Sequence, residues 1–120
     1  HSQTSTFCAK NKKIKPIIDL YLKELKKSIR PQEVIVFGSF AKGKATAESD
    51  LDLVVISSDF AGRSFDERFS LLARARLHPK TRKIAMDIFG YTPEEFKAAS
   101  PLTTLGEVKE TGVTIFQSKT

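Results

Sequence analysis

The sequence is poor in cysteine: Cys8 is the single thiol among 120 residues. A disulfide framework and a zinc site built from cysteines both need further thiols, so this composition excludes them. The chain also has no apolar run near the roughly 18 residues that cross a bilayer, and its first residues lack the apolar block of a signal peptide. We therefore expect a cytoplasmic protein with no membrane partner.

Long tracts rich in glycine, proline or any one residue type are also lacking, so the composition does not indicate extended disorder. Apolar residues make up 40% and charged residues 28% of the chain, which is ordinary for a globular protein. A chain of this length can enclose one hydrophobic core but not two. We therefore expect one folded domain with one site.

Positive charge is in excess, with 20 Lys and Arg against 14 Asp and Glu, for a formal net charge of +6. Such a chain attracts polyanions, including nucleotides, nucleic acids and acidic proteins. Many of the lysines surround the first predicted helix, where solvation of its outer face explains them. Aromatic side chains are not interleaved with them as a surface that stacks nucleobases requires. We therefore do not expect a nucleic-acid partner.

Hydrophobic periodicity predicts helices and strands along most of the chain. Residues 1–10 show no periodicity, and we interpret them as a disordered or vector-derived N-terminus ahead of a single domain at 11–120. The expected elements are a helix at 14–29, strands at 33–37 and 51–56, a helix at 65–77, a strand at 83–89, helices at 93–99 and 105–110, and an edge strand at 113–116. This order predicts an α/β (α+β) fold with a small mixed sheet of about four strands and helices packed mainly on one face.

The most informative segment joins the first two predicted strands. Gly38-Ser39 follows the first strand, ten residues intervene, and Asp50-Leu-Asp52 opens the second. From average residue usage, four fixed residues at this spacing arise by chance in such a chain with a probability on the order of one in a thousand. Alone, Gly-Ser is usually a turn and Asp-x-Asp a solvated strand end. Their combination between two apolar strands favours a nucleotide site.

Each part of this motif suits a phosphate or a metal ion. Gly38 has no Cβ to obstruct a phosphate, and Ser39 can open a short helix whose free N–H groups favour an anion. Asp50 and Asp52 are two apart on a predicted strand, so their carboxylates project from one face, with Cα atoms roughly 6.5 to 7 Å apart. Two such carboxylates repel each other unless a cation such as Mg²⁺ neutralises them.

The segment resembles the nucleotidyltransferase signature of the DNA polymerase beta superfamily, and most resembles its minimal, single-domain bacterial and archaeal members. The order of elements is similar to that family from about Ile17 to Phe116. In that family a third carboxylate comes from a later strand, and Asp87 in the segment Lys83 to Phe89 matches it. An aspartate in an apolar strand needs a metal or a charged partner. A salt bridge to a nearby Lys or Arg is therefore the alternative for Asp87.

The resemblance implies a metal-dependent transfer of a nucleoside monophosphate, AMP above all, from a nucleoside triphosphate to a hydroxyl acceptor. Asp50, Asp52 and Asp87 would be the catalytic and metal-binding residues, with two Mg²⁺ ions as the expected cofactor and Mn²⁺ as a substitute. The nucleotide-binding residues would be Gly38, Ser39, Lys42 and Ser49. For Ser49, capping of the turn ahead of Asp50 is the structural alternative.

The sequence departs from the family at Phe40 and Lys42, where arginines are common. Lys42 keeps the positive charge but loses the bidentate fork of arginine, and Phe40 removes one polar contact to a triphosphate. Minimal members of the family resemble antitoxins that pair with a small helical HEPN-type protein, which some of them modify with AMP. The resemblance therefore implies a protein acceptor. The alternative is a non-catalytic, antitoxin-like binding module that neutralises a HEPN-type partner.

Overall fold

Four strands form one mixed sheet in the computed structural model, which describes residues 2–118 and their side chains from Thr6 onward. The elements in chain order are α1 (Ser2–Lys10), α2 (Lys15–Leu25), β1 (Glu33–Phe37), β2 (Leu51–Ile56), the 3-10 turn η1 (Ser58–Phe60), α3 (Phe65–Arg74), the 3-10 turn η2 (Pro79–Arg82), β3 (Met86–Tyr91), α4 (Pro93–Ala98), α5 (Thr104–Thr111) and β4 (Val113–Gln117). The strands lie in the order β3-β2-β1-β4. Strand β1 is antiparallel to β2 and β4, whereas β2 and β3 are parallel.

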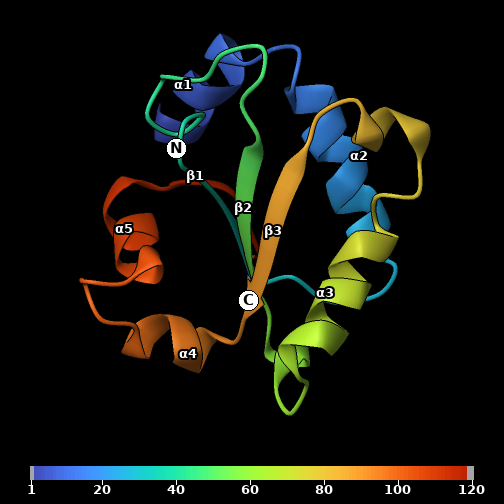
Figure 1. Cartoon of the computed structure of the whole chain (residues 1–120), viewed down its shortest axis with the longest axis vertical. Helices are drawn as coiled ribbons and strands as arrows, with labels where there is room; N and C mark the ends of the chain where they lie inside the picture. The colour runs from blue at the N-terminus through green and yellow to red at the C-terminus, as the bar shows by residue number, and fades with distance from the viewer. Residues whose placement is uncertain (1, 119–120) are drawn as a thin grey trace.

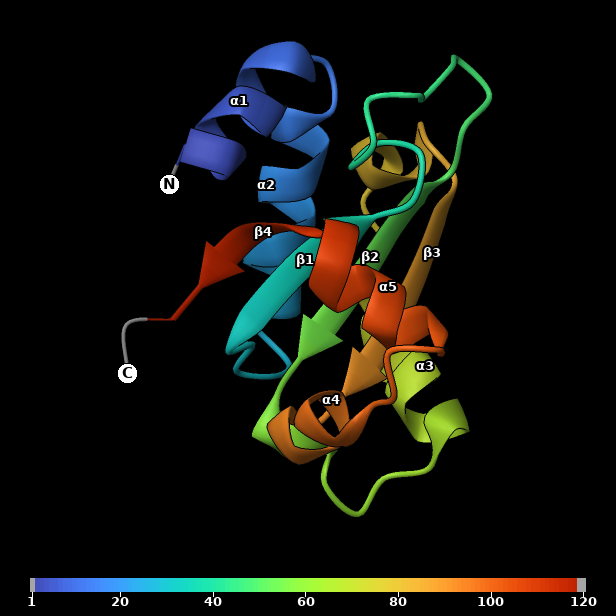
Figure 2. The ribbon, with the colours of Figure 1, turned by 90° about the vertical axis from the view of Figure 1, so that its left-hand side faces the viewer.

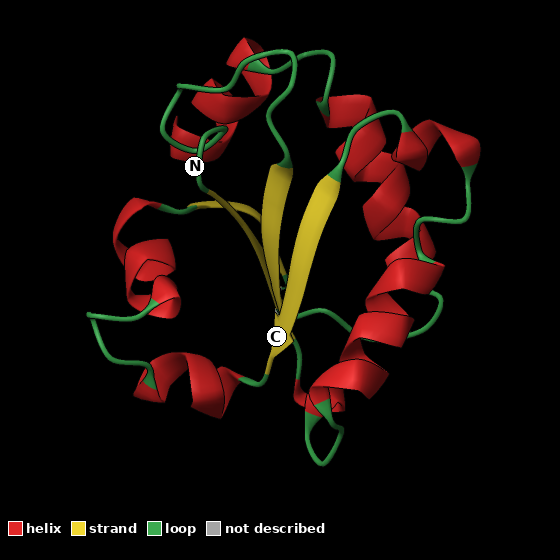
Figure 3. Ribbon diagram, viewed as in Figure 1, coloured by secondary structure: helices red, strands yellow, loops and turns green. Residues whose placement is uncertain are grey.

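The central strands β1 and β2 are apolar because both of their faces are covered. Val34 and Val36 belong to the larger core, which α2 and α3 cover, whereas Ile35 and Phe37 belong to a smaller core with residues of α4 and α5. Figure 1 shows α2 and α3 on one side of the sheet and α4 and α5 on the other, and Figure 3 shows the same layers by element type. The predicted α/β fold and four-stranded sheet are confirmed. Helices α4 and α5 pack on the face of the sheet opposite α2 and α3 (Figure 1).

Side-chain hydrogen bonds fix the helices against one another and against the sheet. The buried Tyr21 hydroxyl on α2 donates to the carbonyl of Leu72 on α3 at 2.9 Å. The nearly buried Arg68 on α3 donates to the carbonyl of Gly90 on β3 at 3.1 Å and forms a two-pronged ion pair with Glu95 on α4. Helix α4 begins with a capping box between Thr92 and Glu95, which satisfies backbone N–H groups at the start of the helix.

The N-terminal segment differs from the expectation of disorder. Residues Ser2–Lys10 form helix α1, and Phe7 is buried in the larger core at 4% exposure. A single buried aromatic residue in a polar segment gives no repeating apolar pattern from which a helix could be predicted. The expectation of disorder is therefore wrong for residues 2–10, the vector-derived alternative stays a prediction, and His1 lies outside the described residues.

The third strand begins three residues later than predicted and ends at Tyr91. Residues 83–85 instead follow the turn η2 without strand structure, and Arg76 Nη2 donates to the carbonyls of Thr81 and Ile84 at 3.1 and 2.8 Å. Those bonds hold the segment against the end of α3, so it cannot extend the strand. No helix within residues 2–118 is long and apolar enough to cross a membrane.

Candidate active site

The Gly-Ser motif lies in the tight turn that follows β1. The backbone reverses at Gly38 and Gly43, whose φ angles are +72° and +70°, a conformation that glycine adopts without strain. The Lys42 N–H donates to the Gly38 carbonyl at 3.1 Å, and the Lys44 N–H donates to the Ser39 carbonyl at 2.9 Å. The segment is thus a hydrogen-bonded turn, in place of the short helix expected to begin at Ser39.

This turn presents unpaired backbone donors. Within the described chain, the N–H groups of residues 39–41 form no hydrogen bond. Successive free N–H groups in a turn form a concavity that binds anions, as a helix N-terminus does. The turn can therefore receive a phosphate although it is not helical.

Gly38 lies directly against the carboxylate of Asp52. A Cβ placed on Gly38 would overlap Asp52 Oδ2, because β1 ends beside the start of β2 and Phe37 is paired with Asp52. A side chain at this position would therefore force the Asp52 carboxylate to move. The turn and the first acid of β2 are thus parts of one site.

The structure brings two of the three predicted acids together. Asp52 on β2 is paired with Asp87 on β3, and residues paired across parallel strands project from the same face. Burial raises the pKa of Asp52 above its ordinary range, and the charges of Asp87 and Asp50, a hydrogen bond with Asp87 and the charge of Glu107 raise it further. Asp50 precedes β2 and is exposed, yet its charge reaches Asp52.

Asp87 has no basic neighbour of the kind that the alternative interpretation required. Among residues 2–118 it forms no ion pair with a lysine or arginine. The salt-bridge interpretation of Asp87 therefore has no support in the structure.

The donor set suits a hard divalent cation. Carboxylate oxygens are the ligands that Mg²⁺ and Mn²⁺ prefer, and the negative charges that raise the pKa of Asp52 are those that a cation would neutralise. In the part of the chain that the structure describes, no three or more His, Cys, Asp or Glu side chains are already arranged as a metal-ion site. The carboxylates of Asp50, Asp52 and Asp87 would have to converge further to hold one ion together.

Lys42 and Ser49 are differently placed. Lys42 Nζ lies 2.5 Å from Glu107 Oε1 on α5, so the predicted phosphate ligand is held by a carboxylate. The Ser49 hydroxyl accepts from the Thr46 N–H at 2.8 Å, as the turn-capping alternative predicts. The structure thus ties Lys42 to α5 and Ser49 to its own loop.

Glu107 is the residue of the site that sequence reasoning missed. It lies on α5, 65 residues after Lys42, and Figure 2 shows α5 crossing in front of β1 and β2. No short motif surrounds it, so only the packing of α5 on the sheet reveals its place.

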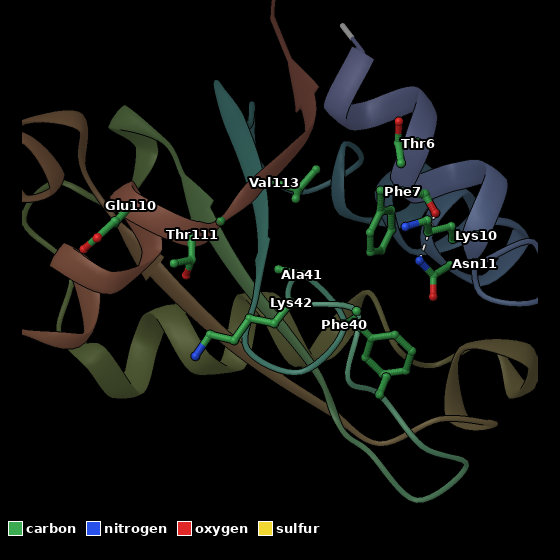
Figure 4. A pocket seen from close by; sticks show the side chains of 13 residues that line it. Thr6, Phe7, Lys10, Asn11, Phe40, Ala41, Lys42, Glu110, Thr111 and Val113 are labelled. Carbon is green, nitrogen blue, oxygen red and sulfur yellow. Dashed lines mark hydrogen bonds between the residues drawn. The ribbon is translucent and has the colours of Figure 1, made fainter.

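A cavity of about 610 Å³ is lined by residues of the Gly38–Gly43 turn. It is enclosed by α1, the turn and the junction of α5 with β4, and Figure 4 shows the side chains of Phe40 and Lys42 leaving the turn in different directions. Phe40 is 8% exposed and packs in the larger core. Asp52 and Asp87 do not line this cavity, and we do not assign the chemistry to it.

Comparison with known proteins identifies the family. The model of the family described as the nucleotidyltransferase domain matches residues 18–110, which include the Gly-Ser turn and all three acids. The chain belongs to this nucleotidyltransferase family. The resemblance inferred from the motif is therefore confirmed, and so is the prediction of a nucleotidyltransferase enzyme.

Individual relatives agree with this assignment. A candidate protein adenylyltransferase of Methanocaldococcus jannaschii is 36% identical over 59 residues, which are 49% of this chain and 59% of that protein. The chain thus spans about three-fifths of this relative. The crystal structure of a candidate nucleotidyltransferase of Sulfolobus solfataricus superimposes with a TM-score of 0.66 at 15% identity, covering 92% of this chain and 86% of that one.

Two further solved structures come from toxin-antitoxin pairs. One, crystallised with AMP-PNP, has a TM-score of 0.60 and 20% identity, and covers 84% of this chain and 73% of that one. A mutant of the toxin-antitoxin pair MntA-HpeT has a TM-score of 0.57 and 18% identity, and covers 82% and 71%. At these identities the solved structures show the shared fold alone.

Proposed function

We propose that this domain is a divalent-metal-dependent enzyme that moves AMP from ATP to a hydroxyl group on a partner protein. The observation that carries the proposal is the pairing of Asp52 with Asp87 on one face of the sheet, beside a turn with free N–H groups at 39–41. The turn can hold phosphate oxygens, and the acids can hold a cation next to them. Both halves of a nucleoside-triphosphate site are then adjacent.

Each group has a role in the transfer. The N–H groups of residues 39–41 would bind the departing pyrophosphate, and Asp50 with Asp52 would hold Mg²⁺ or Mn²⁺. When bound, such ions neutralise triphosphate oxygens and lower the pKa of an attacking hydroxyl. Asp87 would accept the proton of that hydroxyl. A bond then forms between the hydroxyl oxygen and the α-phosphorus, while the bond from the α-phosphorus to pyrophosphate breaks.

The choice of AMP and of a protein acceptor rests on the relatives. The Methanocaldococcus protein is named as a candidate protein adenylyltransferase, and one toxin-antitoxin neighbour was crystallised with an ATP analogue. The antitoxin-like resemblance and the two toxin-antitoxin neighbours support a small helical HEPN-type protein as the acceptor.

An apolar surface beside Asp87 agrees with a protein acceptor. Phe65 and Phe69 on α3 are 65% and 67% exposed, and Phe89 on the edge strand β3 is 45% exposed. Together with Asp87 they line one groove. Exposed apolar patches of this kind are typical of protein contacts, and a partner bound here would bring a hydroxyl group to Asp87.

The test follows transfer of labelled AMP to a candidate HEPN-type partner. Purified protein, labelled ATP, Mg²⁺ and the partner are incubated, and the partner's mass is followed for an AMP increment on tyrosine, serine or threonine. The variant with Asp50→Asn and Asp52→Asn should give no increment. The variant Asp19→Asn, which removes an exposed aspartate of α2, should match the wild type.

Two results would contradict the proposal. Rapid adenylylation of a free small molecule by the domain alone would remove the need for a protein acceptor. Failure to bind any triphosphate, together with tight binding to the partner, would favour the non-catalytic module that only neutralises it.

A further inference from the structure

We infer that Glu107 is a specificity-determining residue of this site, because its carboxylate competes with the phosphates of the nucleotide for Lys42. The inference rests on the proposed function, since it concerns the affinity for a triphosphate. It assigns a role to a residue outside the Gly-Ser and Asp-x-Asp motif and outside the strand that carries Asp87.

Lys42 and Glu107 form an exposed ion pair. Lys42 Nζ and Glu107 Oε1 are 2.5 Å apart, and the two side chains are 41% and 43% exposed. Exposed ion pairs contribute little net stability because water solvates both partners when they separate. The pair can therefore open without disturbing the fold, and α5 keeps its backbone hydrogen bond from Glu107 N–H to the Thr103 carbonyl.

This ion pair includes a residue of the Gly38–Gly43 turn. Lys42 belongs to the turn whose free N–H groups at 39–41 face no protein acceptor, so a phosphate bound to them would be within reach of the lysine side chain. Glu107 is also close enough to the acids that its charge acts on Asp52. Its carboxylate thus contacts Lys42 and also acts electrostatically on Asp52.

Binding of a phosphate to Lys42 has a cost. A phosphate that takes Lys42 must displace Glu107 from it. A ligand that does not reach Lys42 carries no such cost. Glu107 therefore weakens the binding of nucleotides whose distal phosphates use Lys42, and leaves a nucleoside without phosphates unaffected.

The experiment measures the Kd of ATP with Mg²⁺ by calorimetry for the wild type and for Glu107→Gln, Lys42→Met and the double variant. From the strength of exposed ion pairs, Glu107→Gln should tighten ATP binding about two- to five-fold. Lys42→Met should weaken it, and adding Glu107→Gln to that variant should bring no gain. The Kd of adenosine should be the same in all four proteins.

Glu110→Gln is the matched control, because Glu110 is exposed on the same helix and forms no ion pair within the described residues. It removes the same charge. An equal gain in ATP affinity for Glu110→Gln would mean that the effect of Glu107→Gln comes from net charge alone, and would overturn the inference. Weaker or unchanged ATP binding by Glu107→Gln would also overturn it. If the wild type binds no ATP at all, both the proposed function and this inference fail. If the wild type binds ATP, the result for Glu107→Gln decides the inference alone.

Discussion

Asp52 and Asp87 occupy paired positions on the parallel strands β2 and β3, where burial and then the charge of Asp87 raise the pKa of Asp52. Two acids in this arrangement resist full ionisation, because each charge raises the cost of the other. The affinity of the site for protons and cations is therefore linked to the stability of the fold.

The first prediction follows from the raised pKa of Asp52. Because this pKa is higher in the folded than in the unfolded chain, the folded state holds more protons between the two values, and stability must fall as pH rises through that window. Denaturant unfolding in EDTA, from pH 4 upward, should show this fall for the wild type. Asp52→Asn should flatten it, and an equal slope in both proteins would contradict the assignment to Asp52.

The second prediction concerns Asp50→Asn combined with Asp52→Asn. The double variant should lose Mg²⁺-dependent ATP binding, since it removes two of the three proposed metal ligands. Its thermal stability without metal should equal or exceed that of the wild type, because the repulsion that raises the pKa of Asp52 is relieved. Calorimetry and thermal melts measure the two effects, and unchanged ATP affinity would remove the metal-site argument.

The third prediction compares two glycines with the same backbone conformation. Gly38 and Gly43 have φ angles of +72° and +70°, but a Cβ at Gly38 would overlap Asp52, whereas a Cβ at Gly43 has no atom within 4 Å. Gly43→Ala should cost only the strain of a positive φ, about 1 kcal/mol, and keep ATP binding. Gly38→Ala should cost more and also displace the Asp52 carboxylate. Equal ATP affinity in the two variants would show that the contact with Asp52 does not matter.

The fourth prediction tests the ion pair that joins α3 to α4. Arg68 is nearly buried and lowers the pKa of Glu95, so Glu95 contributes stability above its unfolded pKa and loses it as pH falls. Glu95→Gln should cost about 1–2 kcal/mol near neutral pH, and less in acid. Glu94→Gln, which removes an exposed charge in the same helical turn, should change unfolding little. Similar losses in both variants would assign the effect to the helix dipole.

Local chemistry explains how much of this fold could be predicted from the sequence. The strands β1 and β2 were predicted at their observed bounds because runs of buried apolar residues are strong signals. The start of α4 at Pro93 was also predicted, because proline suits the first position of a helix. Helix α1 and the late start of β3 were missed, since Phe7 and Arg76 act through tertiary contacts that no local pattern encodes.

Part of the site could also be predicted from the sequence. The spacing of Gly38 and Asp52 in the motif pointed to a shared site, and the structure places them in contact. The pairing of Asp52 with Asp87 depends on the register of β2 and β3, which the sequence does not reveal. Glu107 could not be found, because its partner Lys42 is distant in the chain and their contact exists only once α5 packs on the sheet.

The last prediction separates nucleotide binding from transfer by means of Asp87→Asn. Asp87 is exposed at the groove formed with Phe65, Phe69 and Phe89, whereas the turn at Gly38 lies at the other side of Asp52. If Asp87 serves the attacking hydroxyl, the variant should lower the rate of AMP transfer to the partner by about 10²–10⁴-fold, the usual contribution of a general base. ATP affinity should change far less.

The two quantities are measured on the same protein samples, ATP affinity by calorimetry and transfer by the mass of the partner. Thermal melts should show a fold as stable as the wild type, because Asp87 forms no ion pair with a lysine or arginine within residues 2–118. Asp66→Asn, an exposed aspartate on α3 that lines the same groove, is the matched control and should leave transfer within a few-fold of the wild type. Equal losses of binding and transfer would place Asp87 with the nucleotide, and unfolding of the variant would restore a structural role for this carboxylate.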